Sequence, residues 1–317
     1  HELNYVYIAS SENGSHITSA NANHDYHVIR AATEGVLGGK LTGMFVATLD
    51  DSQAATGVSE NDFYTIGARQ AGKVGGLDYR VEYYHQWGDG GVDASTADLA
   101  EAYTTTPTLT APGDIDRDAN MFGIRIGKTF KNAGMSPTFT LWYDNLSGTD
   151  DTDVAGNDYG TFNTLQDTGH KFYGLIDNYT SDIGNGTQRY GLQDIAIKAK
   201  LNVSAKNVLK VDFHQFLTQT DLEDGDSDTI RTNATTSGAF QSGSNGSGVL
   251  SNDLGQEVDV TLVHKYHSNT KMVFGYSHYF TTLTHSYLNG SGAADAAGRV
   301  AENDDQDWVY VMVDTKF

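Results

Sequence analysis

Charged side chains alternate with apolar or aromatic ones in several segments of this chain. In residues 77–87, Asp78, Arg80 and Glu82 occupy every second position, and Tyr79 and Val81 stand between them. Side chains two residues apart point to the same face of a β-strand. Such a segment therefore has a charged face, which can bind or steer ions and polar solutes, and a second face that suits apolar surroundings.

The same alternation predicts a set of inward-facing charges along the chain. Rings of one sign set ion selectivity in channels, whereas mixed signs more often pair across strands and stiffen a wall. The set here is mixed, and its basic members predict a weak preference for anions, opposed by acidic outer loops. The predicted pore-lining residues are Arg69, Arg80, Glu82, Arg125, Asp194, Lys198, Lys200, Lys210, Asp212, Glu257 and Lys265.

Catalytic chemistry is a weaker interpretation. His278 with Ser277, or His214 with Asp212, would form a pair on paper, but a chain this rich in Ser and Asp offers such sets by composition alone. No nucleophile stands in a recognisable motif. We therefore predict no catalytic residue and no enzyme, and keep an enzyme at the barrel rim as the third alternative.

Metal and cofactor sites are not predicted either. Acidic runs such as residues 221–228 could supply oxygen ligands to Ca²⁺, yet none fits the EF-hand loop, and a solvated acidic loop is the simpler interpretation. His264 and His267 are three residues apart in a segment that alternates like a strand, so they point to opposite faces. We expect no cofactor.

Composition excludes several classes of protein. The 317 residues carry 41 acidic and 20 basic side chains, a net charge of −21, which argues against nucleic acid as a partner. Cysteine is absent, which excludes disulfides and thiolate metal sites. Apolar runs are far shorter than the roughly twenty residues of a transmembrane helix. Strands of a membrane barrel need only about ten alternating residues.

Twelve alternating segments are separated in turn by short turns rich in Gly and Asn and by long polar stretches. This rhythm predicts one all-β domain over residues 1–317, an antiparallel transmembrane β-barrel in a bacterial outer membrane, surrounded by lipid and lipopolysaccharide. The long loops are expected at 88–117, 147–188, 222–253 and 285–306. The strands are expected at 3–10, 24–36, 40–50, 61–72, 77–87, 120–130, 137–146, 190–203, 208–219, 256–267, 271–282 and 307–317.

Aromatic residues support the same fold. The last segment alternates from Trp308 and ends on Phe317, as outer-membrane barrels typically do. Aromatics near strand ends would form the interfacial girdles of such a barrel. The girdle candidates are Tyr5, Tyr26, Tyr64, Tyr83, Trp87, Tyr143, Tyr190, Tyr266 and Tyr287.

Residues 167–179, with the sequence DTGHKFYGLIDNY, resemble the loop element of the alginate-export family of outer-membrane porins. Residues 254–259 and 275–280, together with the final strand, are similar to that family too. The resemblance implies a channel for a solute, with an anionic sugar or polysaccharide as the candidate. It also implies about eighteen strands in the full barrel, so we expect either strands before His1 or a smaller relative.

The resemblance also implies that the 167–179 loop lies toward the pore. His170, Lys171, Phe172 and Tyr173 are then expected to constrict it. The alternative is that Phe172 and Tyr173 merely anchor the loop to the barrel wall. A second alternative concerns the whole protein, which would be a structural sleeve around a partner protein of a secretion or electron-transfer complex.

Overall fold

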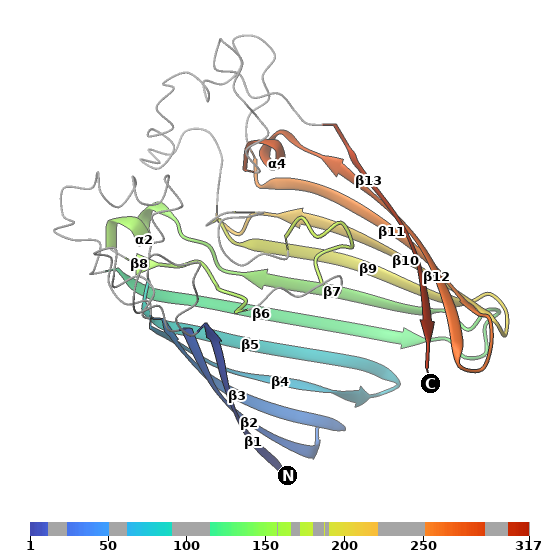
Figure 1. Ribbon diagram of the computed structural model, residues 1–317, viewed down its shortest axis with the longest axis horizontal. Helices are drawn as coiled ribbons and strands as arrows, with labels where there is room; N and C mark the ends of the chain where they lie inside the picture. Colours follow the sequence, from blue (N-terminus) through green and yellow to red (C-terminus); the bar gives the residue numbers. More distant parts are fainter. Residues whose placement is uncertain are drawn as a thin grey trace, which may run out of the picture.

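A computed structural model describes residues 1–11, 24–50, 62–90, 115–156, 158–165, 172–179, 187, 190–220, 251–288 and 304–316. These residues form one antiparallel sheet in which each long strand pairs with its neighbour in the sequence (Figure 1). The long strands are β1 (Glu2–Ser11), β2 (His24–Val36), β3 (Gly39–Asp50), β4 (Phe63–Val74), β5 (Leu77–Asp89), β6 (Asp116–Thr129), β7 (Thr138–Leu146), β9 (Leu192–Asn202), β10 (Asn207–Leu217), β11 (Asp253–Lys265), β12 (Thr270–Thr281) and β13 (Gln306–Thr315).

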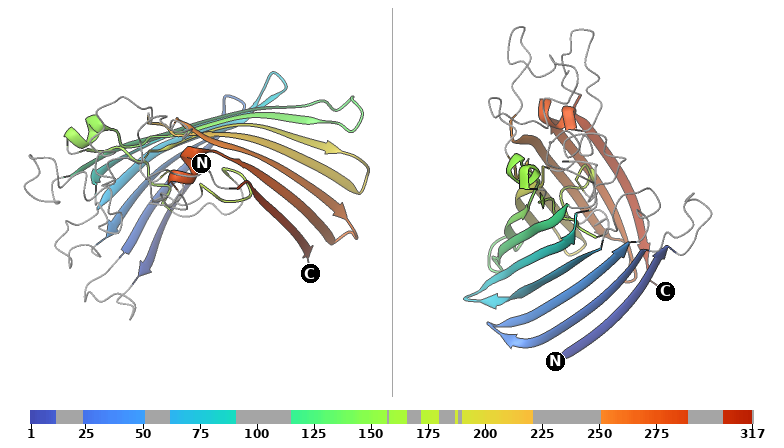
Figure 2. Two further views of the ribbon diagram at one scale, coloured as in Figure 1. Left: turned by 90° about the horizontal axis from the view of Figure 1, so that it is seen from above. Right: turned by 90° about the vertical axis from the view of Figure 1, so that its left-hand side faces the viewer.

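The predicted all-β antiparallel fold and its twelve long strands are confirmed. A further two-residue strand, β8 (Asp158–Tyr159), pairs in parallel with β6. The sheet curves into a trough, with the short turns at one end (Figures 1 and 2). Its order begins at β1 and ends at β13, and within the described ranges these two strands are not paired with each other.

Two short hairpin turns follow directly from their residues. Gly75 and Gly76 join β4 to β5 with φ angles of 59° and 79°. Leu37 and Gly38 join β2 to β3 with φ angles of 47° and 73°. Positive φ at both central residues matches the twist of the flanking strands, and glycine adopts it without steric cost.

Strand register separates two faces of the sheet. One face, called the inner face from here on, carries Glu82, Asp144 and Asp194 on three strands. The opposite, outer face is apolar and solvent-exposed in the isolated chain. It includes Ile66, Val81, Ile126, Leu141, Ile197 and Phe274. A continuous apolar surface of this extent needs a nonpolar environment or a partner.

The main apolar core lies on the inner face. Phe162, Tyr173 and Tyr179 come from the connection between β7 and β9, and they pack against Phe216 and Tyr279 of the wall. The trough therefore contains part of the chain itself, drawn in yellow-green beneath the arch of the sheet in Figure 2.

The aromatic girdle is only partly as expected. Tyr5, Tyr83 and Trp87 are exposed on the outer face. Tyr26 and Tyr190 are buried instead. Tyr26 belongs to the inner face because its partner in the register is Thr48, and its hydroxyl donates to the carbonyl of Leu165 at 3.4 Å.

Two one-and-a-half-turn helices lie in the long connections: α2 (Asp151–Gly156) and α4 (Leu283–Leu288). Asp150 and Asp153 each accept the other's backbone N–H at 2.9 Å, which is a reciprocal capping arrangement at the start of α2. In the part of the chain that the structure describes, neither helix has the length or apolarity to cross a membrane.

We expect Gly67→Ala to destabilise the sheet by about 1–3 kcal/mol through overpacking. A Cβ at Gly67 would lie 2.2 Å from the ring of Tyr84, which covers this glycine from the neighbouring strand. Gly43→Ala on adjacent β3 is the matched control, because the nearest atom to its Cβ is 4.0 Å away. Urea midpoints of the folded protein in lipid vesicles measure both, and equal midpoints would contradict the packing argument.

Candidate functional site

Arg125 of β6 is the centre of the first charged cluster on the inner face. Its Nη2 lies 2.9 Å from Asp144 of β7, and its Nη1 lies 3.5 Å from Glu82 of β5. Gly123, between the two carboxylates in the register, makes this possible, since a Cβ there would lie 2.7 Å from Asp144 Oδ1. The guanidinium carbon also lies over the ring of Trp142, 3.4 Å from its centroid.

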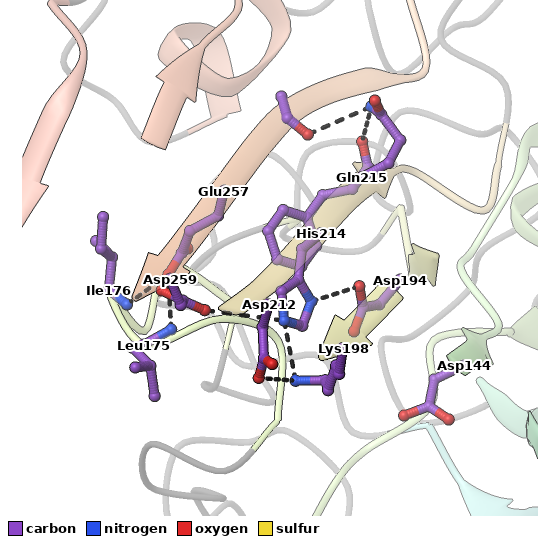
Figure 3. A network of polar contacts seen from close by, with 12 residues as sticks. Asp144, Leu175, Ile176, Asp194, Lys198, Asp212, His214, Gln215, Glu257 and Asp259 are labelled. Atoms are coloured by element: carbon purple, nitrogen blue, oxygen red, sulfur yellow. Dashed lines mark hydrogen bonds and ion pairs between the residues drawn. The ribbon is translucent and has the colours of Figure 1, made fainter. Parts of the chain in front are cut away.

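A second cluster centres on His214 of β10, which is fully buried (Figure 3). Its Nδ1 lies 2.8 Å from Asp194, and its Nε2 lies 3.0 Å from Lys198 Nζ. Lys198 in turn donates to Asp212 at 3.1 Å. These contacts fit one neutral tautomer, in which Nδ1–H donates to Asp194 and Nε2 accepts from the ammonium of Lys198.

Residues 172–179 are held against this wall by their backbone. The N–H groups of Leu175 and Ile176 donate to Glu257 Oε1 at 2.6 and 3.0 Å (Figure 3). Gly174, with φ of +85°, lets the backbone approach, because a Cβ there would lie 2.3 Å from Glu257 Oε2. A buried carboxyl oxygen that accepts from two N–H groups fixes the segment to β11.

The end of the same segment is held by a cluster of buried side chains. The hydroxyl of Tyr179 lies 2.5 Å from that of Tyr279 and 2.8 Å from Nδ1 of His285 in α4. Burial raises the pKa of Tyr179 well above its ordinary value and lowers the pKa of His285 to about 4. Both groups are therefore neutral at neutral pH, and the cluster is a network of neutral hydrogen bonds.

Phe172 and Tyr173 lie beside the first cluster. The ring of Phe172 is 5.1 Å from the guanidinium of Arg125 and 5.6 Å from the ring of Trp142. A cavity of about 180 Å³ lies here between the segment and the wall, and it is lined by Arg80, Arg125, Phe172 and Tyr173 among others. The Nε atoms of Arg80 and Arg125 are buried and have no hydrogen-bond partner in the described ranges.

The predicted pore-lining residues all fall on one face. Register places Arg69, Arg80, Glu82, Arg125, Asp194, Lys198, Lys200, Lys210, Asp212, Glu257 and Lys265 on the inner face. The structure joins Arg80, Glu82 and Arg125 in the first cluster and Asp194, Lys198 and Asp212 in the second. His170 and Lys171 lie outside the described residues.

Sequence reasoning missed several residues of the site. Trp142 shares a face with Asp144, and period-two alternation was the available signal for it. His214 was considered as a catalytic partner of Asp212, but the carboxylate at its Nδ1 is Asp194. Tyr179 and His285 are 106 residues apart, and no local pattern in the sequence indicates that they meet.

The family model described as alginate export matches residues 12–282. The chain belongs to the alginate-export family. The resemblance drawn from the 167–179 element is thereby confirmed. A solved structure described as the NanC porin in a rhombohedral crystal form is similar over 93% of this chain and 94% of that one, at 6% identity and a TM-score of 0.35. No curated protein sequence matches the chain.

In this alginate-export family member, Glu257→Ala should release the segment at 172–179. We expect hydrogen exchange of the Leu175 and Ile176 amides to become roughly tenfold faster or more, since each loses its hydrogen-bond acceptor. Glu257→Gln is the matched control, because its amide oxygen still accepts a hydrogen bond. Unchanged exchange in the alanine variant would mean that side-chain packing alone holds the segment.

Acid should weaken the same fold through His285. Its pKa falls from 6.5 to about 4 on burial, so the unfolded chain binds a proton first. Stability from the neutral imidazole is complete above about pH 6.5 and is lost as the pH falls toward 4, by at most about 3 kcal/mol. The difference in urea midpoint between the wild type and His285→Gln should narrow over this pH range. A constant difference would show that His285 does not titrate there.

Proposed function

We propose that this chain forms the wall of an outer-membrane channel, a single barrel domain over residues 1–317, that passes an anionic, saccharide-type solute along its inner face. The observation that carries the proposal is the cavity beside Arg80 and Arg125. There, the guanidinium group of Arg125 lies next to the rings of Trp142 and Phe172, and Arg80 lines the same cavity.

The chemistry of this cavity suits an acidic sugar. Guanidinium groups bind carboxylates by directed, charge-assisted hydrogen bonds. Aromatic rings offer flat apolar surfaces to a ring-shaped solute. Asp144 and Trp142 hold Arg125 in place, so little side-chain entropy is lost when it binds an anion. The opposing carboxylates of Glu82 and Asp144 keep the net charge small, which favours passage over retention.

Residues 172–179 support the channel over the sleeve. They cover the inner face of β10 to β12, where Glu257 and Tyr279 hold them. A partner protein that filled the trough would have to displace this segment and its buried aromatic contacts. A constriction formed by Phe172 and Tyr173 narrows the path of a small solute instead, and the same two residues anchor the segment.

The outer face supports placement in a membrane. Its exposed apolar side chains would contact lipid, with lipopolysaccharide beside the long connections. The proposed role is transport without catalysis. The acidic groups of the inner face have structural partners: Asp194 binds His214, and Asp259 accepts a hydrogen bond from Ser277 at 2.6 Å.

Reversal potentials across a planar bilayer with a salt gradient test the proposal. We expect a preference for anions in the wild type, reduced by roughly twofold or more in Arg80→Gln, because a charge is removed beside the constriction. Arg30→Gln is the matched control: it loses the same charge on the inner face of β2, where Arg30 pairs with Glu2 at 3.2 Å. Cation selectivity of the wild type, or equal effects of both variants, would contradict the proposal.

A further inference from the structure

Lysines gather at the short-turn end of the sheet, although the chain as a whole has a net charge of −21. Lys200 of β9 and Lys210 of β10 are direct partners in the register of the inner face. Lys265 of β11 and Lys271 of β12 are direct partners two strands further along. Like charges directly opposite each other destabilise a sheet, so the fold does not explain this arrangement.

Among the described residues, only one of these lysines has a carboxylate partner. Lys271 lies 2.8 Å from Asp314 of β13. Lys200, Lys206, Lys210, Lys265 and Lys316, called the rim lysines from here on, make no ion pair within the described ranges, and all are exposed. By contrast, Lys198, two residues from Lys200 on the same face, is paired with Asp212. The positive charge is therefore uncompensated at the end of the sheet and compensated in its middle.

The short turns enclose a hollow at this end. It has a volume of about 590 Å³ and is lined by Lys206, Lys265, Lys271 and Lys316, with Asp314 as its one acidic group. The turn after β9 and the turn after β11 form its sides: the backbone N–H of Lys265 donates to the carbonyl of Lys206 at 2.8 Å. Figure 1 shows the two turns side by side at the same end of the sheet.

The direction of the lysines favours a dissolved ligand over a lipid headgroup. Lys200, Lys210 and Lys265 are on the inner face, whereas Ile195, Ile197 and Phe213 of the same hairpin are exposed on the outer face. A lipid would contact the outer side chains. A molecule in the trough would meet the lysines, on strands spaced about 5 Å apart, so several of its charges can be bound at once.

We propose that the rim lysines form a docking site for a linear oligoanion, a chain bearing several carboxylate, sulfate or phosphate groups, at the short-turn mouth of the channel. The inference rests on the proposed function, because it takes from it that the trough conducts a solute. It adds the place where a polyanionic solute first binds. The site is distinct from the cavity beside Arg80 and Arg125, which a single sugar unit would fill.

Binding to the folded protein in detergent tests the site without any current. The variant Lys206→Gln, Lys210→Gln, Lys265→Gln removes three rim charges. The control variant Lys40→Gln, Lys73→Gln, Lys131→Gln removes three charges from other short turns, where Lys40 and Lys73 already have acidic partners. Calorimetry with a short oligogalacturonate should show about tenfold weaker binding for the first variant, an effect that shrinks with added salt. Equal affinities of the two variants would overturn the proposal.

The second measurement is whether block of the channel current depends on the side from which the oligoanion is added. Oligogalacturonate added from the short-turn side should block wild-type channels with an on-rate about tenfold higher than in the rim variant. Because the chain has no cysteine, Asn132→Cys in a short turn lets an impermeant thiol reagent identify that side. If no channel conducts but calorimetry still separates the variants, the proposed function fails and the docking site stands. If the variants differ only in binding to vesicles with anionic lipid, the site is for headgroups and the proposal is overturned.

Discussion

The antiparallel hydrogen-bond ladder is the constraint on which the rest of this structure depends. It sets each strand's register against its neighbours, and a shift of one residue would turn every side chain to the other face. The inner face is continuous because strand register keeps Glu82, Asp144 and Asp194 on the same side of the sheet across four strands. Charge pairing, aromatic packing and the cavity are consequences of that register.

The connection between β7 and β9 adds an apolar core inside the trough, which a simple barrel wall lacks. Part of it returns into the trough and forms an apolar core there, with Tyr179 and Phe216 rings 4.8 Å apart. Backbone groups away from a strand ladder need other partners, and the side chain of Glu257 accepts hydrogen bonds from two of them. The segment is thus held to the wall by apolar packing and by hydrogen bonds.

Charge is ordered along the strands. Acidic residues dominate the long connections in the sequence, and paired charges occupy the middle of the inner face. At the short turns stand lysines that make no ion pair with any residue the structure describes. Paired charges in a partly buried wall mainly fix geometry, whereas unpaired exposed charges create a field that reaches about one Debye length into the solvent. An anion moving along the inner face would meet these two kinds of surface in turn.

The sequence by itself determined the strands, their alternation and the face on which each charge lies, because a period of two is local and survives without knowledge of the partners. The residues 167–179 also sufficed to indicate the family. Only the tertiary structure decided that Arg125 joins Asp144, that His214 joins Asp194, and that Tyr179 meets His285. Those contacts depend on which strands are neighbours and on where a long connection returns. These are non-local choices, settled by burial and by the pairing of buried polar groups rather than by any pattern along the chain.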